Sequence, residues 1–578
     1  GRLPDAGFEV STKKLTLATK DGTLLSPTDF SLRWSPAQGK QPANGAATAN
    51  GLDLDVLARL ASYLPLDAGT HATLETYAPR GKVFDLKLGW KGDAETLTAF
   101  NVNARFEALG RRAYGYYPGF DGLTGRIDGN EKGGRVEVSG RHAILELPTV
   151  FADPRLELDE LKVQASWTAK DGRFDVQLQN LAFNNPDASG NASGRYLSDP
   201  QGPGEIDIIA NLSRADGAAV WRYMPLGVNR DVRDWLREAI RGGRADEAKL
   251  RLQGNLKDFP FADGKNGIFK VTAKITGTSL RYSPDWPGIE NIAGDLLFEG
   301  KRMLIKARQG SIYGVALSGI SAEIADLEAP EEILAITGRA AGPTADFLRF
   351  IVTSPVAEKL DHYTDSMQAE GQGTLALRLT LPLRRLEQSK IDGEYQFLRN
   401  ALVVDTDLPP ITDVTGRLNF TGGGITIKEI RGQLLGAPLI VKAATRKDGT
   451  VAMDAQGSLN IAGMRNFRDH LLFNHLSGSA PLQGTVLVKG SSTEVVLESN
   501  LQGIASSLPA PFNKSATDVM PFRFERTSLT AGSDQVRVSL GKVLSAQLLR
   551  RVDKDNRVIE RGAVGLGEPT PALPEKDI

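Results

Sequence analysis

The sequence contains no cysteine among its 578 residues. Disulfide bonds and zinc sites built on thiolates are therefore excluded. Histidine is also scarce, and no two of the five histidines have the spacing of metal ligands on a regular element: His71, His142, His362, His470 and His475. We therefore expect no metal site and no cofactor.

Long hydrophobic runs are absent as well. No stretch of about 18 or more apolar residues occurs, which excludes a membrane-spanning helix within this sequence. The chain starts with Gly1 and leads directly into strand-like sequence, without a signal peptide. We expect a fragment of a longer protein, with a natural amino-terminal part missing.

Neither sign of charge dominates the sequence. There are 69 basic and 70 acidic residues, and the basic residues do not gather into blocks. This balance excludes the usual electrostatic surface of a nucleic-acid-binding protein. No nucleophile elbow and no phosphate-binding loop are present, and carboxylates such as Asp326 and Glu328 suit a solvated strand edge better than a catalytic pair. We expect a protein without enzymatic activity.

Alternation of apolar and polar residues is the dominant pattern of the sequence. In residues 84–90 the even positions are apolar, and similar alternation recurs in 163–167, 174–178 and 375–381. Period-two alternation predicts β-strands with one apolar and one wet face. Asp-Gly pairs provide tight hairpin turns between such runs, at Lys20-Asp21-Gly22, Lys170-Asp171-Gly172 and Lys447-Asp448-Gly449. The pattern predicts long antiparallel meanders of roughly 35 to 40 strands.

Only four segments have helical periodicity, at about 52–64, 228–241, 344–363 and 461–476. So few helices cannot cover the apolar faces of so many strands. Either the sheets pack on one another as sandwiches or a β-helix, or they curve into a trough with an apolar lining. A long open trough would be a large exposed apolar surface, and such surfaces usually bind apolar ligands.

A Pro-initiated motif occurs three times. In each copy a proline is followed by apolar residues at the third and sixth positions and by glycine at the eighth. The copies are Pro118-Gly119-Phe120-Asp121-Gly122-Leu123-Thr124-Gly125, Pro287-Gly288-Ile289-Glu290-Asn291-Ile292-Ala293-Gly294 and Pro409-Pro410-Ile411-Thr412-Asp413-Val414-Thr415-Gly416. Each copy follows a helical segment and a pair of strands, which indicates large repeats.

The repeats predict a division of the chain into repeat units. Residues 1–50 would hold strands of a preceding repeat and a loose loop over 36–50. Repeat units would follow at 51–215, 216–342, 343–460 and, incomplete, 461–552, before a disordered tail at 553–578.

Several stretches resemble the YhdP family of AsmA-like proteins in Gram-negative bacteria. The resemblance spans about 50 to 515 and rests on these segments in this order: Tyr117-Pro118-Gly119-Phe120-Asp121-Gly122-Leu123-Thr124-Gly125, Tyr223-Met224-Pro225, Trp235-Leu236, Gly254-Asn255-Leu256, Asp258-Phe259-Pro260-Phe261 and Leu508-Pro509-Ala510-Pro511-Phe512-Asn513-Lys514. It implies an elongated repeating β-groove of curved antiparallel sheets, closed at each repeat by a short helix or loop. It also implies a periplasmic protein, anchored in the inner membrane by a missing amino-terminal helix, that carries phospholipid toward the outer membrane.

The alternation and the resemblance together give a set of expected lining residues for phospholipid acyl chains. They are apolar or aromatic and sit at strand positions: Phe84, Leu86, Leu88, Trp90, Val163, Ala165, Trp167, Phe174, Val176, Leu178, Ile206, Ile208, Leu250, Leu252, Val271, Ile275, Leu296, Phe298, Leu375, Leu377, Leu379, Tyr395, Phe397, Leu418, Phe420, Leu439, Val441, Val486 and Val488.

Two alternatives stay open at this point. In the first, the apolar face is closed by packing and the chain is an envelope assembly protein that binds outer-membrane proteins. In the second, the chain is a parallel β-helix acting on carbohydrate, although the Asp-Gly hairpins and the missing acid pair count against it.

Overall fold

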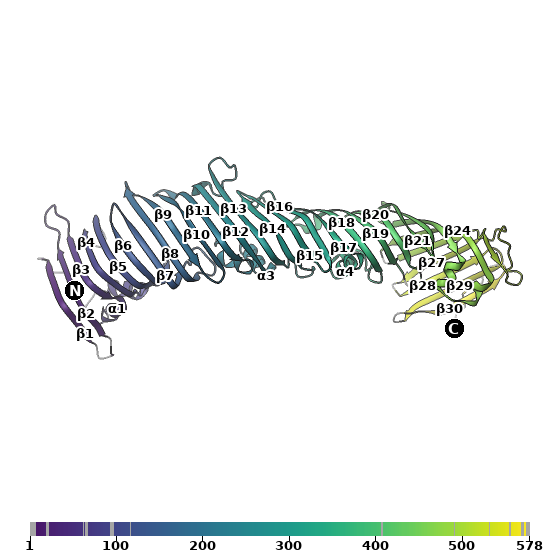
Figure 1. Ribbon diagram of the computed structural model, residues 1–578, viewed down its shortest axis with the longest axis horizontal. Coiled ribbons are helices and arrows are strands. Elements are labelled where there is room, and N and C mark those ends of the chain that lie inside the picture. The colour runs from purple at the N-terminus through teal and green to yellow at the C-terminus, as the bar shows by residue number, and fades with distance from the viewer. Residues whose placement is uncertain are drawn as a thin grey trace. The chain divides into compact units, whose positions relative to one another are not determined.

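The alternating runs form antiparallel strands of up to 16 residues in the computed structural model (Figure 1). The structure describes residues 7–18, 22, 24–61, 63, 68–92, 97–115, 117–405, 408–490, 492–530, 532–553, 556–567 and 572–573. The chain forms two units. Unit 1 comprises Gly1–Leu280 with Ala293–Leu304, and unit 2 comprises Arg281–Ile292 with Ile305–Ile578.

In unit 1, thirteen strands pair in chain order, each antiparallel to the next. They are β1 (Phe8–Ala18), β2 (Leu24–Ser35), β3 (Asn44–Asp53), β4 (Arg80–Lys91), β5 (Ala99–Arg111), β6 (Gly119–Asn130), β7 (Gly133–Glu146), β8 (Arg155–Lys170), β9 (Arg173–Asn184), β10 (Ala188–Asp199), β11 (Gly202–Asp216), β12 (Ile240–Asn255) and β13 (Gly267–Leu280). β14 (Ile289–Glu299) and β15 (Arg302–Ile312) each have residues in both units.

Unit 2 continues the same kind of meander, again with antiparallel pairs; β25 pairs directly with β27, and β26 pairs with β24. Its strands are β16 (Val315–Ile324), β17 (Ile333–Pro343), β18 (Gln368–Pro382), β19 (Lys390–Val403), β20 (Ile411–Thr421), β21 (Gly424–Leu434), β22 (Ala437–Thr445), β23 (Val451–Asn460), β24 (Leu476–Lys489), β25 (Ser492–Ser499), β26 (Ile504–Ser506), β27 (Phe522–Thr530), β28 (Ser533–Leu540), β29 (Leu544–Asp553) and β30 (Asn556–Leu566).

The antiparallel ladders exclude the parallel β-helix and confirm the mainly β fold. The described residues contain 30 strands, fewer than the 35 to 40 expected. The estimate was too high because single strands are far longer than the usual five or six residues. The predicted turn at Asp171-Gly172 is confirmed: both residues have positive φ, 53° and 75°, between β8 and β9.

Helices are short and separate groups of strands. Unit 1 contains α1 (Leu54–Ala61), α2 (Ala68–Tyr77), the 3-10 helix η1 (Gly217–Tyr223), α3 (Arg230–Ala239) and η2 (Leu256–Asp258). Unit 2 contains α4 (Thr344–Val352), α5 (Val356–Lys359), η3 (Leu386–Gln388), α6 (Ile461–Phe467) and η4 (Leu471–His475). Each of the four predicted segments therefore contains helix. The sequence missed α2, which lacks an apolar stripe.

The expectation of a loose loop over 36–50 was wrong in its second half, where β3 begins at Asn44. The segment is rich in small residues because the neighbouring strand covers it. A Cβ atom added to Gly45 would lie 2.0 Å from the Trp90 ring, which occupies the space above that glycine. The composition that suggested a loop is thus what allows β3 to lie under a tryptophan.

The expectation of a disordered tail from 553 also needs correction. Residues 556–566 form β30, which pairs with β29 over its length. This segment still carries strand-forming residues such as Val558, Ile559 and Val564, and the proline-rich composition begins only at Pro569. Most of the sequence after 567 lies outside the described residues. The division into repeat units stays a prediction.

The Pro-initiated motif leads into β6, β14 and β20, and its fifth position has positive φ in all three copies. The angles are 75° at Gly122, 55° at Asn291 and 48° at Asp413. Glycine, asparagine and aspartate are the residues that adopt this left-handed conformation most readily. In the first and third copies the strand register shifts beside this fifth position. The shifts lie between Asp121 and Leu123 and between Thr412 and Thr415. The motif therefore encodes a strand start followed by a β-bulge.

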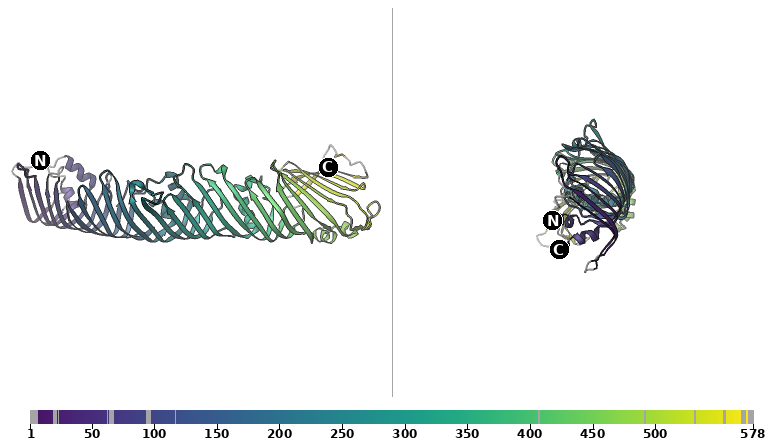
Figure 2. Two further views of the ribbon diagram at one scale, coloured as in Figure 1. Left: turned by 90° about the horizontal axis from the view of Figure 1, so that it is seen from above. Right: turned by 90° about the vertical axis from the view of Figure 1, so that its left-hand side faces the viewer.

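Bulges of this kind recur along the sheets. Other non-glycine residues with positive φ beside a register shift include Asp85, Ala108, Glu247 and Arg399. A bulge bends its strand and increases the local twist. Repeated strand after strand, this bending is consistent with sheets that are hollow on one side, as Figure 2 shows.

The bulge interpretation can be tested at Asp413. We expect Asp413→Val to lower the free energy of unfolding by about 1–2 kcal/mol, because a β-branched residue is strained at positive φ. Asp413→Gly at the same position should cause no such loss. Urea unfolding of both variants against the unchanged chain measures the difference. Equal midpoints for the two variants would contradict the assignment.

Candidate functional site

Apolar side chains line up across the strands of unit 1. Residues paired across an antiparallel ladder point to the same face of the sheet. One row runs from β4 to β12 through Leu88, Val102, Gly129, Gly134, Trp167, Val176, Tyr196, Ile206 and Gly254. The next runs from β5 to β13 through Ala104, Ile127, Val136, Ala165, Leu178, Gly194, Ile208, Leu252 and Phe269.

Unit 2 has the same arrangement. A single row crosses twelve strands, from β18 to β30, through Gly373, Phe397, Gly416, Ile430, Val441, Ala455, Gly484, Leu497, Phe524, Val538, Ala546 and Val564. Every member is apolar or glycine. We call the face that carries these rows in each unit the lining face.

Glycines on the lining face accommodate large side chains of the neighbouring strand. A Cβ atom added to Gly134 would lie 2.5 Å from the Trp167 ring, and one added to Gly393 would lie 2.2 Å from the Phe420 ring. The rings thus extend over the adjacent backbone. They cover the peptide groups of the sheet with apolar surface.

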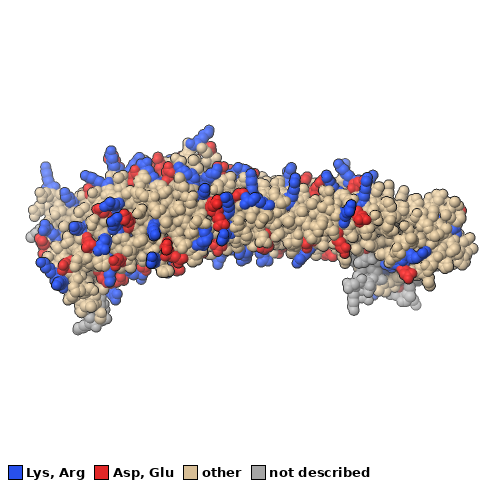
Figure 3. All heavy atoms as spheres, in the orientation of Figure 1, with Lys and Arg blue, Asp and Glu red and all other residues tan. Residues whose placement is uncertain are grey.

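The opposite face is polar and carries ion pairs across neighbouring strands. Arg126 of β6 contacts Glu137 of β7 at 2.8 Å, and Arg195 of β10 contacts Asp175 of β9 at 2.6 Å. The hydrogen bond from Arg126 holds the pKa of Glu137 below its ordinary value. Figure 3 shows both signs of charge scattered over the face turned toward the viewer. This face is solvated, as the alternation predicts.

The helices lie on the hollow side of the sheets, and α4 shows that this is the lining face (Figure 2). Phe347 of α4 packs against Tyr395 of β19, with ring centroids 5.1 Å apart. Tyr395 belongs to the lining face, since it lies opposite Leu375 and Leu418. The concave side of this sheet is therefore its apolar side.

A buried polar group fixes α4 to this face. The fully buried Asn400 side chain donates hydrogen bonds to Thr344 Oγ1 at 2.5 Å and to the Glu370 carbonyl at 3.0 Å. The Tyr395 hydroxyl donates to the same Thr344 oxygen at 2.8 Å. Burial raises the pKa of Tyr395, which keeps it a neutral donor. Thr344 is the first residue of α4, so these bonds position the start of the helix.

The lining face stays accessible away from the helices. Trp167, Val176 and Leu377 are half-buried rather than buried. In an ordinary two-layer protein such side chains would be covered by a second layer. Here the lining is an apolar groove that remains partly open to solvent.

Where the register is resolved, the expected lining residues lie on this face, with the exception of Phe84. Those of β4, β8, β9, β11, β12 and β13 belong to unit 1, and those of β18, β19, β20, β22 and β24 belong to unit 2. Leu296 and Phe298 lie in β14. Phe84, contrary to the expectation, pairs with Arg105, which pairs in turn with Arg126 of the polar face. The bulge at Asp85 turns Phe84 to that side, where the Arg105 guanidinium lies 5.7 Å from its ring. Whether lipid contacts these residues stays a prediction.

The sequence reasoning missed other members of the same rows. Val102, Ile127, Val136, Leu497 and Phe524 lie on the lining face beside the expected residues. The same alternation could have found them.

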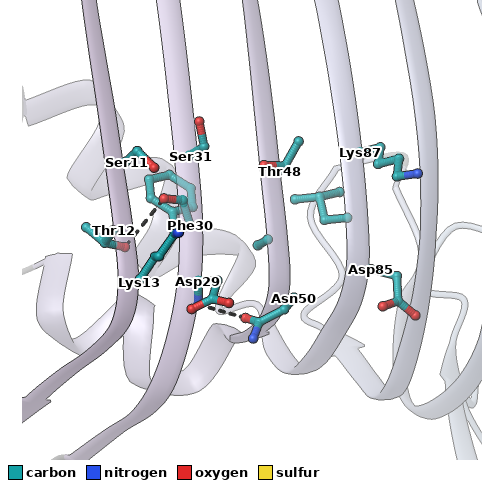
Figure 4. Close-up of a pocket in the computed structure, with 12 residues that line it drawn as sticks. Ser11, Thr12, Lys13, Asp29, Phe30, Ser31, Thr48, Asn50, Asp85 and Lys87 are labelled. Carbon is teal, nitrogen blue, oxygen red and sulfur yellow. Dashed lines mark hydrogen bonds between the residues drawn. The ribbon is translucent and has the colours of Figure 1, made fainter.

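A hollow of about 500 Å³ lies on strands β1 to β4 of unit 1 (Figure 4). Phe30, Ala49 and Leu86 line it together with polar side chains, and the Asp29 backbone N–H donates to Asn50 Oδ1 at 2.8 Å. The polar residues Ser11, Ser31, Thr48 and Lys87 pair with one another across the four strands, on the face opposite the lining face. The hollow therefore belongs mainly to the polar side of the sheet. Across the described residues, no group of three or more possible ligands is placed to hold a metal ion. No helix in the described ranges has the length and apolarity needed to cross a membrane.

The sequence has relatives among known proteins. The model of the YhdP protein family matches residues 2–578. This chain belongs to the YhdP family. A curated member of the family, the intermembrane phospholipid transporter YhdP of Escherichia coli (strain K12), is 26% identical over 520 residues. The match covers 87% of this chain and 40% of that relative, so the chain spans about two fifths of the relative's length. No solved structure matches the chain.

The buried hydrogen bonds of Asn400 should contribute to the stability of the fold. We expect Asn400→Leu to lower the free energy of unfolding by about 2–3 kcal/mol, because the Glu370 carbonyl and Thr344 lose a buried partner. The matched control is Asn191→Leu, on the exposed part of β10. Chemical denaturation measures both. A control variant as unstable as Asn400→Leu would show that the buried hydrogen bonds are not the cause.

Proposed function

We propose that this chain is part of a bridge for phospholipid transfer, in which lipids move along the lining face. The observation that carries the proposal is the series of apolar rows on a concave, partly open face in each unit. The name of the Escherichia coli relative, an intermembrane phospholipid transporter, supports the same conclusion.

The physical chemistry of a phospholipid fits such a groove. Burial of an acyl chain gains about 0.8 kcal/mol per methylene, so two chains need a long apolar surface. The headgroup is charged and must keep its water, because an unpaired buried charge is costly. A groove that is apolar along its floor and open along one side meets both requirements.

Transfer of this kind needs no chemical step. Each lining position offers aliphatic or aromatic contacts without a fixed hydrogen-bond pattern, so neighbouring positions hold an acyl chain about equally well. A lipid then diffuses along the rows of side chains. We therefore propose a protein without catalytic residues or a cofactor.

The location and partners belong to the same proposal. The protein acts in the periplasm, with an inner-membrane anchor in a part of the protein outside this sequence, and delivers phospholipid toward the outer membrane. Phospholipid acyl chains are the ligand of the lining face. The alternative, an assembly factor that binds outer-membrane proteins, predicts a lining closed by packing and free of lipid.

The first prediction concerns lipid content. Native mass spectrometry of the purified chain should show several bound phospholipids, and solvent extraction should recover them. A stable, lipid-free chain would favour the assembly alternative.

The second prediction concerns the lining. Val176→Asp and Leu377→Asp should remove bound phospholipid and block transfer while the protein still folds, because each places a charge on the path of the acyl chains. The control is Gln177→Asp, next to Val176 on the opposite, exposed face. Circular dichroism checks folding. Full transfer by both folded lining variants would exclude this face as the route.

A further inference from the structure

An arginine interrupts the lining face of unit 2. Arg526 of β27 pairs with Val495 of β25 on one side and with Val536 of β28 on the other, so its side chain starts on the apolar face. The side chain is only 8% exposed. Upstream in the same row lie Ile427, Ala443, Met453 and Val486. A buried cation therefore stands where the row is otherwise apolar.

Its ion-pair partner comes from a distant part of the sheet. Arg526 Nη2 lies 2.8 Å from Asp405 Oδ2, and the Asp405 side chain is 18% exposed. Asp405 lies in the connection between β19 and β20. Within the sheet, β27 is reached from β20 only through the ladders of β21, β22, β23, β24 and β25. A direct contact between Asp405 and the lining face of β27 must therefore cross the hollow side.

A second close approach spans the same space. A Cβ atom added to Gly490 would lie 3.7 Å from Asp361 Oδ2. Asp361 precedes β18 at the edge where α4 lies, whereas Gly490 is in the turn between β24 and β25, at the other ends of the strands. The two edges of the sheet approach each other here. Burial raises the pKa of Tyr363, and the nearby Asp405 carboxylate adds to this effect while Arg526 opposes it, so Tyr363 lies beside the ion pair.

We propose that the Asp405–Arg526 pair is a latch that closes the groove of unit 2 and opens to let a lipid pass. The latch rests on the proposed function, since it regulates the same lining face. It divides the lining face of unit 2 into the part on the strands before β27 and the part on β28, β29 and β30.

The chemistry of the contact suits a reversible closure. A buried ion pair adds little net stability compared with apolar residues of similar size, because both ions lose their hydration. When such a pair separates into water, hydration offsets much of the lost attraction. An apolar contact has no such compensation, as in the cluster of Ile461, Ala480 and Ile504 that holds α6 on the sheet. Leucines in place of both Asp405 and Arg526 would close the groove permanently.

The absence of cysteine from the sequence allows a direct test. The double variant Asp405→Cys with Arg526→Cys removes both charges and provides a unique pair of thiols. Before crosslinking it should behave as an open latch. A short, cleavable thiol-to-thiol crosslinker then holds the contact closed, and cleavage releases it.

The probe is phosphatidylethanolamine with a fluorescent headgroup label, loaded onto the chain and released to phosphatidylcholine vesicles. We expect release from the crosslinked variant to be about tenfold slower than from the same variant after cleavage. The matched control is Arg126→Cys with Glu137→Cys, an exposed pair on neighbouring strands that does not cross the groove. Crosslinking of this control should leave release unchanged. A second variant without thiols, Asp405→Asn with Arg526→Met, should release lipid at least as fast as the unchanged chain.

The possible outcomes test the latch and the proposed function separately. Equal release from the crosslinked and the cleaved variant overturns the latch and leaves the proposed function intact. An unchanged chain that takes up no labelled lipid overturns the proposed function and the latch with it. Slow release that cleavage restores, together with an unaffected control, supports both.

Discussion

Register is the constraint on which the rest of this structure depends. Side chains alternate between the two faces of a strand, so a slip of one residue would move a whole apolar set to the solvated face. The rows of the lining face exist only because each ladder keeps its partner, from Leu88 opposite Val102 to Ala546 opposite Val564. The cross-strand ion pairs of the outer face, such as Arg126 with Glu137, favour the same alignment. Both faces therefore specify one register.

The bulges shape the sheets without losing this register. A positive-φ residue such as Asp413 or Asn291 inserts a bend, and the apolar row resumes after it. Regular antiparallel strands alone would give a flatter sheet, whose apolar face would need a second layer. The bends make a single layer concave. The α-helices of each unit can then be restricted to one edge, where in unit 2 the Thr344, Tyr395 and Asn400 hydrogen bonds hold α4.

Local patterns in the sequence were sufficient for most strands, the Asp171-Gly172 turn, most helices and most of the expected residues of the lining face. These features depend on alternation or turn chemistry within a few residues. The sequence did not reveal β3, because its small residues are explained only by Trp90 on the next strand. It did not reveal the Asp405–Arg526 contact either. That pair joins residues far apart in the chain, and nothing near Asp405 in the sequence indicates its partner. The family resemblance contributed the direction of the functional hypothesis rather than any of these contacts.

The aromatic rings that lie over glycines also set the clearance of the groove. A tryptophan or phenylalanine standing upright on a sheet would project into the lumen as a ridge. Trp167 over Gly134 and Phe420 over Gly393 fill the spaces that side chains on those glycines would have taken. The floor of the groove is therefore more even than its large residues would suggest. A cargo that slides over such a floor meets few obstacles of shape, so discrimination between cargoes must arise where they enter or leave it.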